Sequence, residues 1–119
     1  MAVAPRPGRP VRGSTTGRPV MAALDLLGRR WALRILWELR DGPVAARELQ
    51  ARCDAMSSSV LYQRLAELSD AHLVRQSAAG SYELTTIGSG LAAALDPLDT
   101  WARRWQRDLQ RRSRSAGSG

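Results

Sequence analysis

The residues with the most specific chemistry stand on one face of the segment SSSVLYQRLAELSDA, which begins at Ser57. Three leucines at positions i, i+4 and i+7 predict that this segment is a helix with a buried face: Leu61, Leu65 and Leu68. At about 100° per residue, Ser59 and Gln63 fall on the opposite side. A glutamine amide can form two hydrogen bonds to an adenine edge, and a serine hydroxyl can contact a base or a phosphate. The segment therefore predicts a helix that reads DNA.

Neighbouring residues of the same segment could contact the DNA backbone. Ser57 is suited to cap the helix, and the free backbone N–H groups of Ser58 and Ser59 could then bind a phosphate. Tyr62 offers a hydroxyl for a phosphate and a ring for a thymine methyl group. These residues would fix the position of the helix while Gln63 reads a base.

Charged and polar residues around this helix are further candidates for backbone contacts. Arg64 lies at the flank of the leucine face, where it either contacts a phosphate or forms an ion pair with Glu67. Arg47 opens the preceding helix, and Arg75 and Gln76 flank the hairpin that follows. Contacts of this kind add affinity without reading sequence.

A short helix, a turn and a hairpin surround the segment and would position it. Residues 47–53 are amphipathic, and residues 54–56 interrupt the helical pattern. Residues 72–84 hold two short β-prone runs around a tip of small residues. This order predicts a winged helix-turn-helix, mainly α with a small β-wing (an α+β fold), whose second helix enters the DNA major groove.

Two more helices are expected upstream. Residues 20–27 form the first, and Gly28 is suited to end it as a left-handed C-cap. Residues 31–40 form the second, with apolar side chains at i, i+4 and i+8. Arg40 suits the negative end of that helix, and residues 41–43 (Asp-Gly-Pro) end it.

A long amphipathic helix is predicted after the hairpin, from a cap at Thr85 or Thr86 towards Arg112. Its apolar residues are spaced alternately by four and three, which is a heptad seam: Leu91, Leu95, Leu98, Ala102, Trp105 and Leu109. Pro97 should bend this helix or divide it in two. A division would suit Asp96 as the cap and Pro97 as the first position of the second piece.

A chain this short has little of its own sequence left to cover such a seam. We expect the seam and the first helix to pack against a second copy of the chain, which makes a homodimer. The alternative is that the long helix folds back onto the first helix of the same chain. The residues expected at the dimer interface are Leu24, Leu91, Leu95, Leu98, Trp101, Ala102, Trp105 and Leu109.

Three tryptophans could form an effector pocket. Trp101 and Trp105 lie beside or within the seam, and Trp31 could approach from the second predicted helix. Flat indole faces at a subunit interface could sandwich a small planar aromatic or cationic molecule. The alternative is that these rings are ordinary core.

The charge of the 119-residue chain is unevenly distributed. The formal net charge is +7, and every basic side chain is arginine. Residues 1–18 hold four arginines and no acid, residues 103–119 hold six arginines and one aspartate, and residues 19–102 hold eight arginines and ten acids. The composition predicts a disordered basic arm over 1–18, a folded domain over 19–110 and a disordered tail over 111–119. Because the body is nearly neutral, the excess charge alone says little about a partner.

The same residue counts argue against catalysis and against a membrane location. One histidine and one cysteine offer neither a nucleophile–base pair nor a metal shell, so we expect no enzyme, no metal and no cofactor. Cys53 is expected to be a small buried apolar residue. A single cysteine fits a reducing cytoplasm, and no apolar run is long enough to span a membrane.

Several motifs occur in the order found in one known family: Gly28-Arg29-Arg30-Trp31, Ile35-Leu36, Asp41-Gly42-Pro43, Glu48-Leu49 and the stretch from Leu61 to Val74. With them, residues 20–107 resemble the HxlR-type winged-helix transcription regulators, which are related to MarR-like regulators. Some members carry a cysteine for redox sensing just before the first helix. This chain has Arg18-Pro19 there, and so lacks the thiol that such sensing needs.

The resemblance implies a cytoplasmic homodimer that binds double-stranded DNA at a pseudo-palindromic operator and regulates transcription, as a repressor more often than as an activator. A small aromatic effector could release it. The small wing and the nearly neutral body leave a second reading open. In that reading the chain is a winged-helix protein-interaction module without sequence-specific DNA readout.

Overall fold

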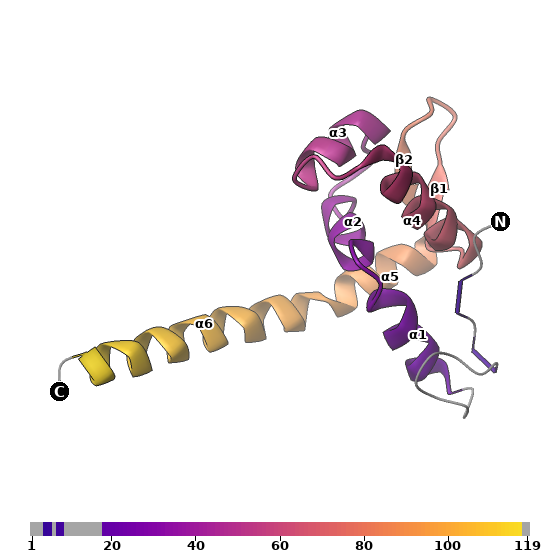
Figure 1. Ribbon diagram of the computed structural model, residues 1–119. Coiled ribbons are helices and arrows are strands. Elements are labelled where there is room, and N and C mark those ends of the chain that lie inside the picture. Colours follow the sequence, from indigo (N-terminus) through magenta and orange to yellow (C-terminus); the bar gives the residue numbers. More distant parts are fainter. Residues whose placement is uncertain (1–3, 6, 9–17, 118–119) are drawn as a thin grey trace. The chain divides into compact units, whose positions relative to one another are not determined.

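Six helices and one two-stranded sheet make up the described part of the chain, residues 4–5, 7–8 and 18–117 of a computed structural model (Figure 1). The basic arm predicted over residues 1–18 lies largely outside the described residues. In chain order the elements are α1 (Pro19–Leu27), α2 (Ala32–Glu38), α3 (Ala46–Arg52), α4 (Ser58–Asp70), β1 (Val74–Gln76), β2 (Tyr82–Leu84), α5 (Thr86–Ala94) and α6 (Asp96–Gly117). The chain divides into two units, Met1–Ser89 and Gly90–Gly119.

The turn between α1 and α2 differs from the predicted one. Gly28 has a right-handed φ of −76°, so the prediction of a left-handed cap is wrong. Its N–H closes the helix onto the carbonyl oxygen of Leu24 at 2.8 Å, and a Cβ at this position would lie 2.9 Å from that oxygen. The left-handed residue is Trp31, with a φ of 77°, and α2 therefore begins one residue later than predicted.

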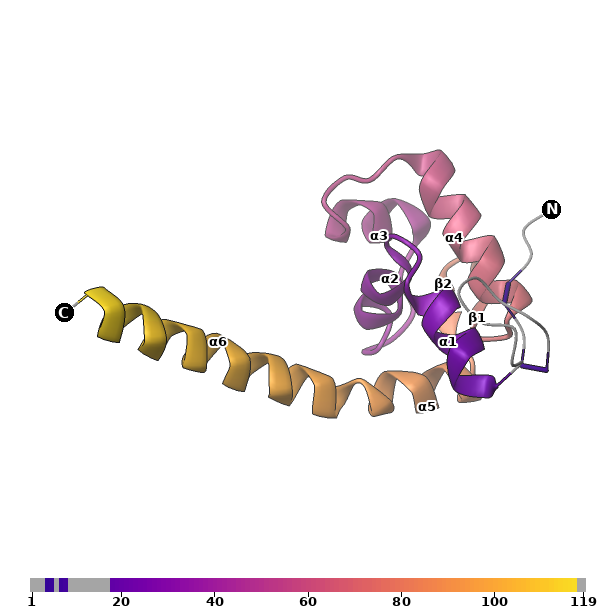
Figure 2. The ribbon, with the colours of Figure 1, turned by 60° about the horizontal axis from the view of Figure 1, so that its bottom comes forward.

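The first unit has the helix-turn-helix order that the sequence predicts. α2 packs on both α1 and α3, and a turn with left-handed Asp54 and Ala55 leads from α3 to α4 (Figures 1 and 2). Ser57 caps α4, because its side chain accepts a hydrogen bond from the N–H of Val60 at 3.3 Å. The predicted buried face of α4 is confirmed, since Leu61, Leu65 and Leu68 are each at most 2% exposed.

The wing is an antiparallel pair of short strands that packs beside α4. Val74 pairs with Leu84 and Gln76 with Tyr82, close to the predicted runs. Val44, just before α3, forms a third short bridge: its N–H and carbonyl group both bond to Tyr82 at 2.9 Å. The hairpin is thereby tied to the helix-turn-helix on two sides.

The N-terminus of α5 is fastened to the beginning of the wing. The hydroxyl of Thr85 accepts the N–H of Gly88 at 3.0 Å and donates to the carbonyl oxygen of His72 at 2.6 Å. The backbone N–H of Thr85 also bonds to the carbonyl oxygen of Leu73 at 3.0 Å. Of the two predicted caps, Thr85 is the one that the structure supports.

In the second unit, Pro97 divides the predicted long helix in two, which is one of the two predicted effects of this proline. α5 ends at Ala94 and α6 begins at Asp96, because Pro97 has no N–H to continue the ladder. The sequence predicts a disordered tail from residue 111, whereas α6 continues to Gly117. Asp108 supports these last turns, since it accepts hydrogen bonds from Arg111 at 3.2 Å and Arg112 at 2.8 Å.

Candidate nucleic-acid interface

The solvent-facing side of α4 carries the residues predicted to contact DNA. Five of them are exposed: Ser57, Ser58, Ser59, Tyr62 and Gln63. Tyr62 keeps 52% of its surface accessible, so a large part of this side chain can contact an outside partner. One amide, one phenol and three hydroxyls are thus exposed on α4 and at its N-cap, and Ser59 and Gln63 lie about 40° apart around the helix, opposite the leucines.

The first turn of α4 is arranged to receive an anion. The hydroxyl of Ser57 accepts a hydrogen bond from the backbone N–H of Val60. The N–H groups of Ser58 and Ser59, earlier in the same turn, are then available to an acceptor from outside the protein. The hydroxyls of Ser57 and Ser59 lie 3.4 Å apart at the same end. A phosphate at this place would face these two hydroxyls and the positive end of the helix dipole.

Arg64 faces the protein. Its side chain is 18% exposed, its Nε donates to the carbonyl oxygen of Arg30 at 2.8 Å, and its Nη1 forms an ion pair with Glu67. Of the two roles left open for this arginine, the structure contains the ion pair. We therefore treat Arg64 as a residue that positions α4.

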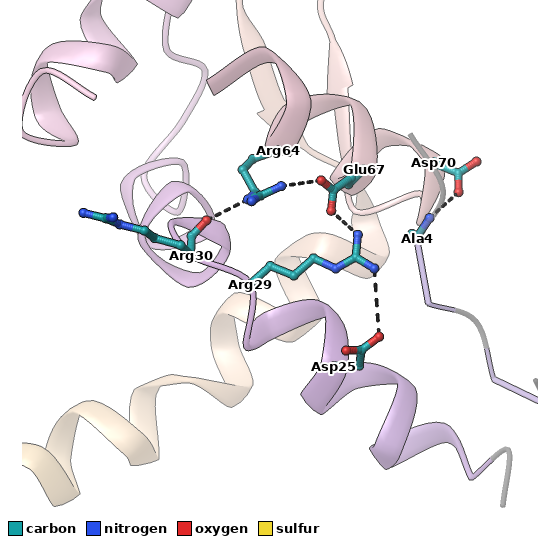
Figure 3. A network of polar contacts seen from close by, with 7 residues as sticks. All are labelled: Ala4, Asp25, Arg29, Arg30, Arg64, Glu67 and Asp70. Atoms are coloured by element: carbon teal, nitrogen blue, oxygen red, sulfur yellow. Dashed lines mark hydrogen bonds and ion pairs between the residues drawn. The ribbon is translucent and has the colours of Figure 1, made fainter. Parts of the chain in front are cut away.

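Glu67 is the centre of a polar network under α4 (Figure 3). It is 3% exposed and accepts from both Arg64 and Arg29, and Arg29 lies 3.9 Å from Asp25 of α1. The network joins the middle of α4 to the end of α1 and to the turn that follows it. The contribution of Arg29 is not visible in the sequence, since that residue lies 38 positions before Glu67.

The other side chains predicted to contact the DNA backbone differ in whether they already bind other groups of the protein. Arg47 is exposed at the second position of α3. Arg75 is 66% exposed but pairs across the strands with Glu83 at 3.1 Å, and the Gln76 amide donates to the carbonyl oxygen of Gly80 at 3.1 Å. The wing residues are thus held by the wing itself, whereas Arg47 can turn towards a phosphate.

Cys53 lies at the end of α3 and is fully buried. Burial raises the pKa of its thiol, against a smaller opposing effect from the Arg34 guanidinium. A raised pKa keeps the thiol protonated near neutral pH, and a protonated thiol is a poor nucleophile. The structure therefore supports the prediction that this cysteine is a small buried apolar residue.

The three tryptophans of the predicted effector pocket fall in different units. Trp101 and Trp105 stack in α6 with ring centroids 5.4 Å apart and planes at 17°, beside a groove of about 810 Å³. Trp31 lines a separate cavity of about 340 Å³ with Leu27, Leu33 and three arginines, and Arg30 lies over its ring. The structure brings the α6 pair together and places Trp31 in the first unit.

Most residues of the predicted dimer interface are large apolar side chains that the single chain leaves open. Leu24 of α1 is 59% exposed, and four residues of α6 are each about half exposed: Leu98, Trp101, Trp105 and Leu109. Leu91, Leu95 and Ala102 are half-buried. No residue of α6 is buried within the described chain. α6 is thus an amphipathic helix of 22 residues whose large apolar side chains are about half exposed in the described part of the chain.

Other kinds of site find no support in the described ranges. No group of three or more potential metal ligands occurs among residues 4–5, 7–8 and 18–117. No helix in that part of the chain is both long and apolar enough to cross a membrane.

A family profile described as "HxlR-like helix-turn-helix" matches residues 26–110. YvaP, an uncharacterised HTH-type transcriptional regulator of Bacillus subtilis (strain 168), is 32% identical over 70% of this chain and 82% of its own length. The HTH-type transcriptional regulator YodB of the same organism is 30% identical over 76% of this chain and 86% of its own. Neither relative is named as an enzyme.

Solved structures show the same likeness. The crystal structure of quinone-bound YodB from B. subtilis superposes with a TM-score of 0.66, at 32% identity, over 71% of this chain and 94% of that one. A structure assigned to the MarR family of transcriptional regulators, from Enterococcus faecalis V583, superposes with a TM-score of 0.69 at 25% identity. It covers 85% of this chain and 97% of that one. The fold predicted from the sequence, mainly helical with a small β-wing, is confirmed.

Proposed function

This chain belongs to the HxlR-like helix-turn-helix family of transcriptional regulators, and from that premise we propose that it is a homodimeric repressor of a pseudo-palindromic operator. The observation that carries the proposal is α4, whose exposed face presents Gln63, Tyr62 and the serines at a capped N-terminus. A helix of this kind fits the major groove, where amide and hydroxyl groups distinguish base pairs. Because the proposed partner is DNA, we also propose that the protein works in the cytoplasm.

The open apolar face of α6 supports the homodimer. A second copy would shield Trp101, Trp105, Leu98 and Leu109 of α6 from water, and the exposed Leu24 of α1 is a further apolar side chain that a partner could cover. Two copies related by a twofold axis would place two α4 helices at half-sites about one turn of DNA apart. The operator is therefore expected to be an inverted repeat.

Selection of bound fragments from a random duplex library tests this proposal. We expect an inverted repeat to be enriched and to bind far more tightly than random DNA across a salt series. Uniform weak binding with a steep salt dependence would contradict operator recognition. That result would favour a winged-helix module that contacts other proteins, the second reading of the sequence.

Gln63→Ala is expected to weaken binding to the selected operator by about 1–3 kcal/mol while leaving binding to random DNA unchanged. The reason is that the amide reads a base edge, and base contacts supply specificity without supplying the general affinity. Fluorescence anisotropy with both DNAs measures the two quantities. Gln106→Ala, an exposed glutamine on α6, is the matched control and should change neither.

We propose in addition that a small aromatic effector releases the protein from DNA. YodB has been crystallised with a quinone, and this chain holds two stacked indole rings beside a groove in α6. A panel of simple quinones is expected to quench tryptophan emission and to lower operator affinity, and Trp101→Leu should reduce both effects. If the panel changes neither emission nor affinity, the effector proposal fails while operator binding stands.

A further inference from the structure

Four arginines form a second pattern on α6, next to its apolar face, and they line the same groove as Trp101 and Trp105. They are spaced by three, four and three residues, and all are exposed: Arg104, Arg107, Arg111 and Arg114. At about 100° per residue they fall within about 80° of one another around the helix. The first and last are ten positions apart, which is about 15 Å of helix length at about 1.5 Å per residue. We call this set the arginine stripe.

The arginines of α6 differ in how strongly carboxylates neutralise them. Outside the stripe, Arg103 pairs with Asp99 at 3.0 Å and Arg112 with Asp108 at 2.8 Å. Within the stripe, Arg111 shares Asp108 at 3.2 Å, whereas Arg104 and Arg107 have no ion-pair partner in the described part of the chain. Arg104 and Arg107 therefore present positive charge that no ion pair in the described residues offsets, along one face of a helix.

The stripe begins within the range that the family profile covers and continues beyond it. The match to the family ends at residue 110, while α6 continues to Gly117 and carries Arg111 and Arg114 beyond it. The tryptophans and leucines that we assign to the dimer lie on a neighbouring face.

We propose that the arginine stripe is a second DNA-binding surface, which binds the phosphate backbone and does not read bases. Duplex DNA presents one negative charge per roughly 1.7 Å of its axis, so 15 Å of helix faces several phosphates. Guanidinium groups bind phosphates through paired hydrogen bonds and stay charged at every physiological pH. Binding of this kind adds affinity without sequence preference. The inference rests on the proposed DNA-binding function, although its own test does not require an operator.

The test compares two charge-matched double variants of the full chain. Arg104→Gln with Arg107→Gln removes two uncompensated charges, and Arg103→Gln with Arg112→Gln removes two that aspartates already bind. DNA affinity is measured on one duplex between about 50 and 200 mM salt. The magnitude of the slope of log affinity against log salt is expected to fall by about 0.9 for each phosphate that the variant no longer binds. A dimer of the first variant lacks two arginines in each copy, so its slope should fall by up to roughly four.

The outcomes separate this inference from the proposed function. A smaller slope for the first variant only, with an unchanged preference for operator over random DNA, supports the stripe. Equal slopes for the wild type and both variants overturn it, as does an equal fall in both variants, which would reflect net charge alone. If the wild type selects no sequence but the first variant still has the smaller slope, the stripe stands and operator recognition fails.

Discussion

Replacing Glu67 by alanine is expected to lower the free energy of unfolding by about 3–5 kcal/mol, a large share of the stability of a domain this small. The carboxylate is 3% exposed and is the shared acceptor of Arg29 and Arg64 (Figure 3). Its removal leaves two guanidinium groups beside an apolar interior without their common partner. Denaturant unfolding followed by circular dichroism measures the change.

Glu48→Ala is the matched control for this variant. Glu48 also pairs with an arginine on its own helix, Arg52 at 2.8 Å, but its side chain is 58% exposed. An exposed pair contributes at most about 1 kcal/mol, because water and salt screen it. If the two alanine variants unfold at the same denaturant concentration, the network under α4 does not support the fold in the way the geometry indicates.

The network also matters for the proposed DNA contact, because it sets how α4 is held. Arg64 anchors the middle of α4 to the carbonyl oxygen of Arg30, and Glu67 anchors the next turn to Arg29. Gln63 lies directly before Arg64, so its direction depends on these anchors. Operator binding by Glu67→Ala should therefore fall even under conditions where the variant remains folded.

The sequence predicts the parts of this molecule that depend on local periodicity. Three features are of this kind: the leucine spacing of α4, the cap at Ser57 and the division between α5 and α6 at Pro97. Each involves residues within one or two helical turns of one another. Local geometry decides such features, and nearby side chains are visible in the sequence. The exposed face of α4 follows from the same spacing, because burying the leucines turns Gln63 outward.

The rest depends on which distant residues meet, and a single sequence does not contain that information. The pairing of Glu67 with Arg29 requires the turn after α1 to lie under α4, which only the packed fold determines. The right-handed Gly28 follows from a close approach to the Leu24 carbonyl, and the left-handed turn falls on Trp31 instead. The helical end of α6 was hidden by its serine- and arginine-rich composition, although Asp108 supplies the ion pairs that support it.

Two glycines on α5 are expected to respond to alanine with opposite signs. Gly88 is buried where α5 crosses the start of the wing, and a Cβ there would overlap the carbonyl oxygen of Leu73 and lie 3.0 Å from its carbonyl carbon. Backbone atoms cannot rotate away as a side chain does, so Gly88→Ala should lower the free energy of unfolding by about 3 kcal/mol. At Gly90 a Cβ meets nothing within 4 Å, and Gly90→Ala should raise it by up to about 1 kcal/mol through better helix propensity.

Thermal and denaturant unfolding of the two variants and the wild type measures both changes. The two variants control for each other, because each adds one methyl group to the same helix. The hydrogen bonds at this junction make the Gly88 effect larger than its volume alone suggests. To relieve the overlap, α5 must move away from Leu73, which pulls on the bond from the Thr85 N–H to Leu73 at 3.0 Å and on the cap from Gly88 to Thr85. A Gly88 variant as stable as the Gly90 variant would mean that α5 does not approach the wing this closely.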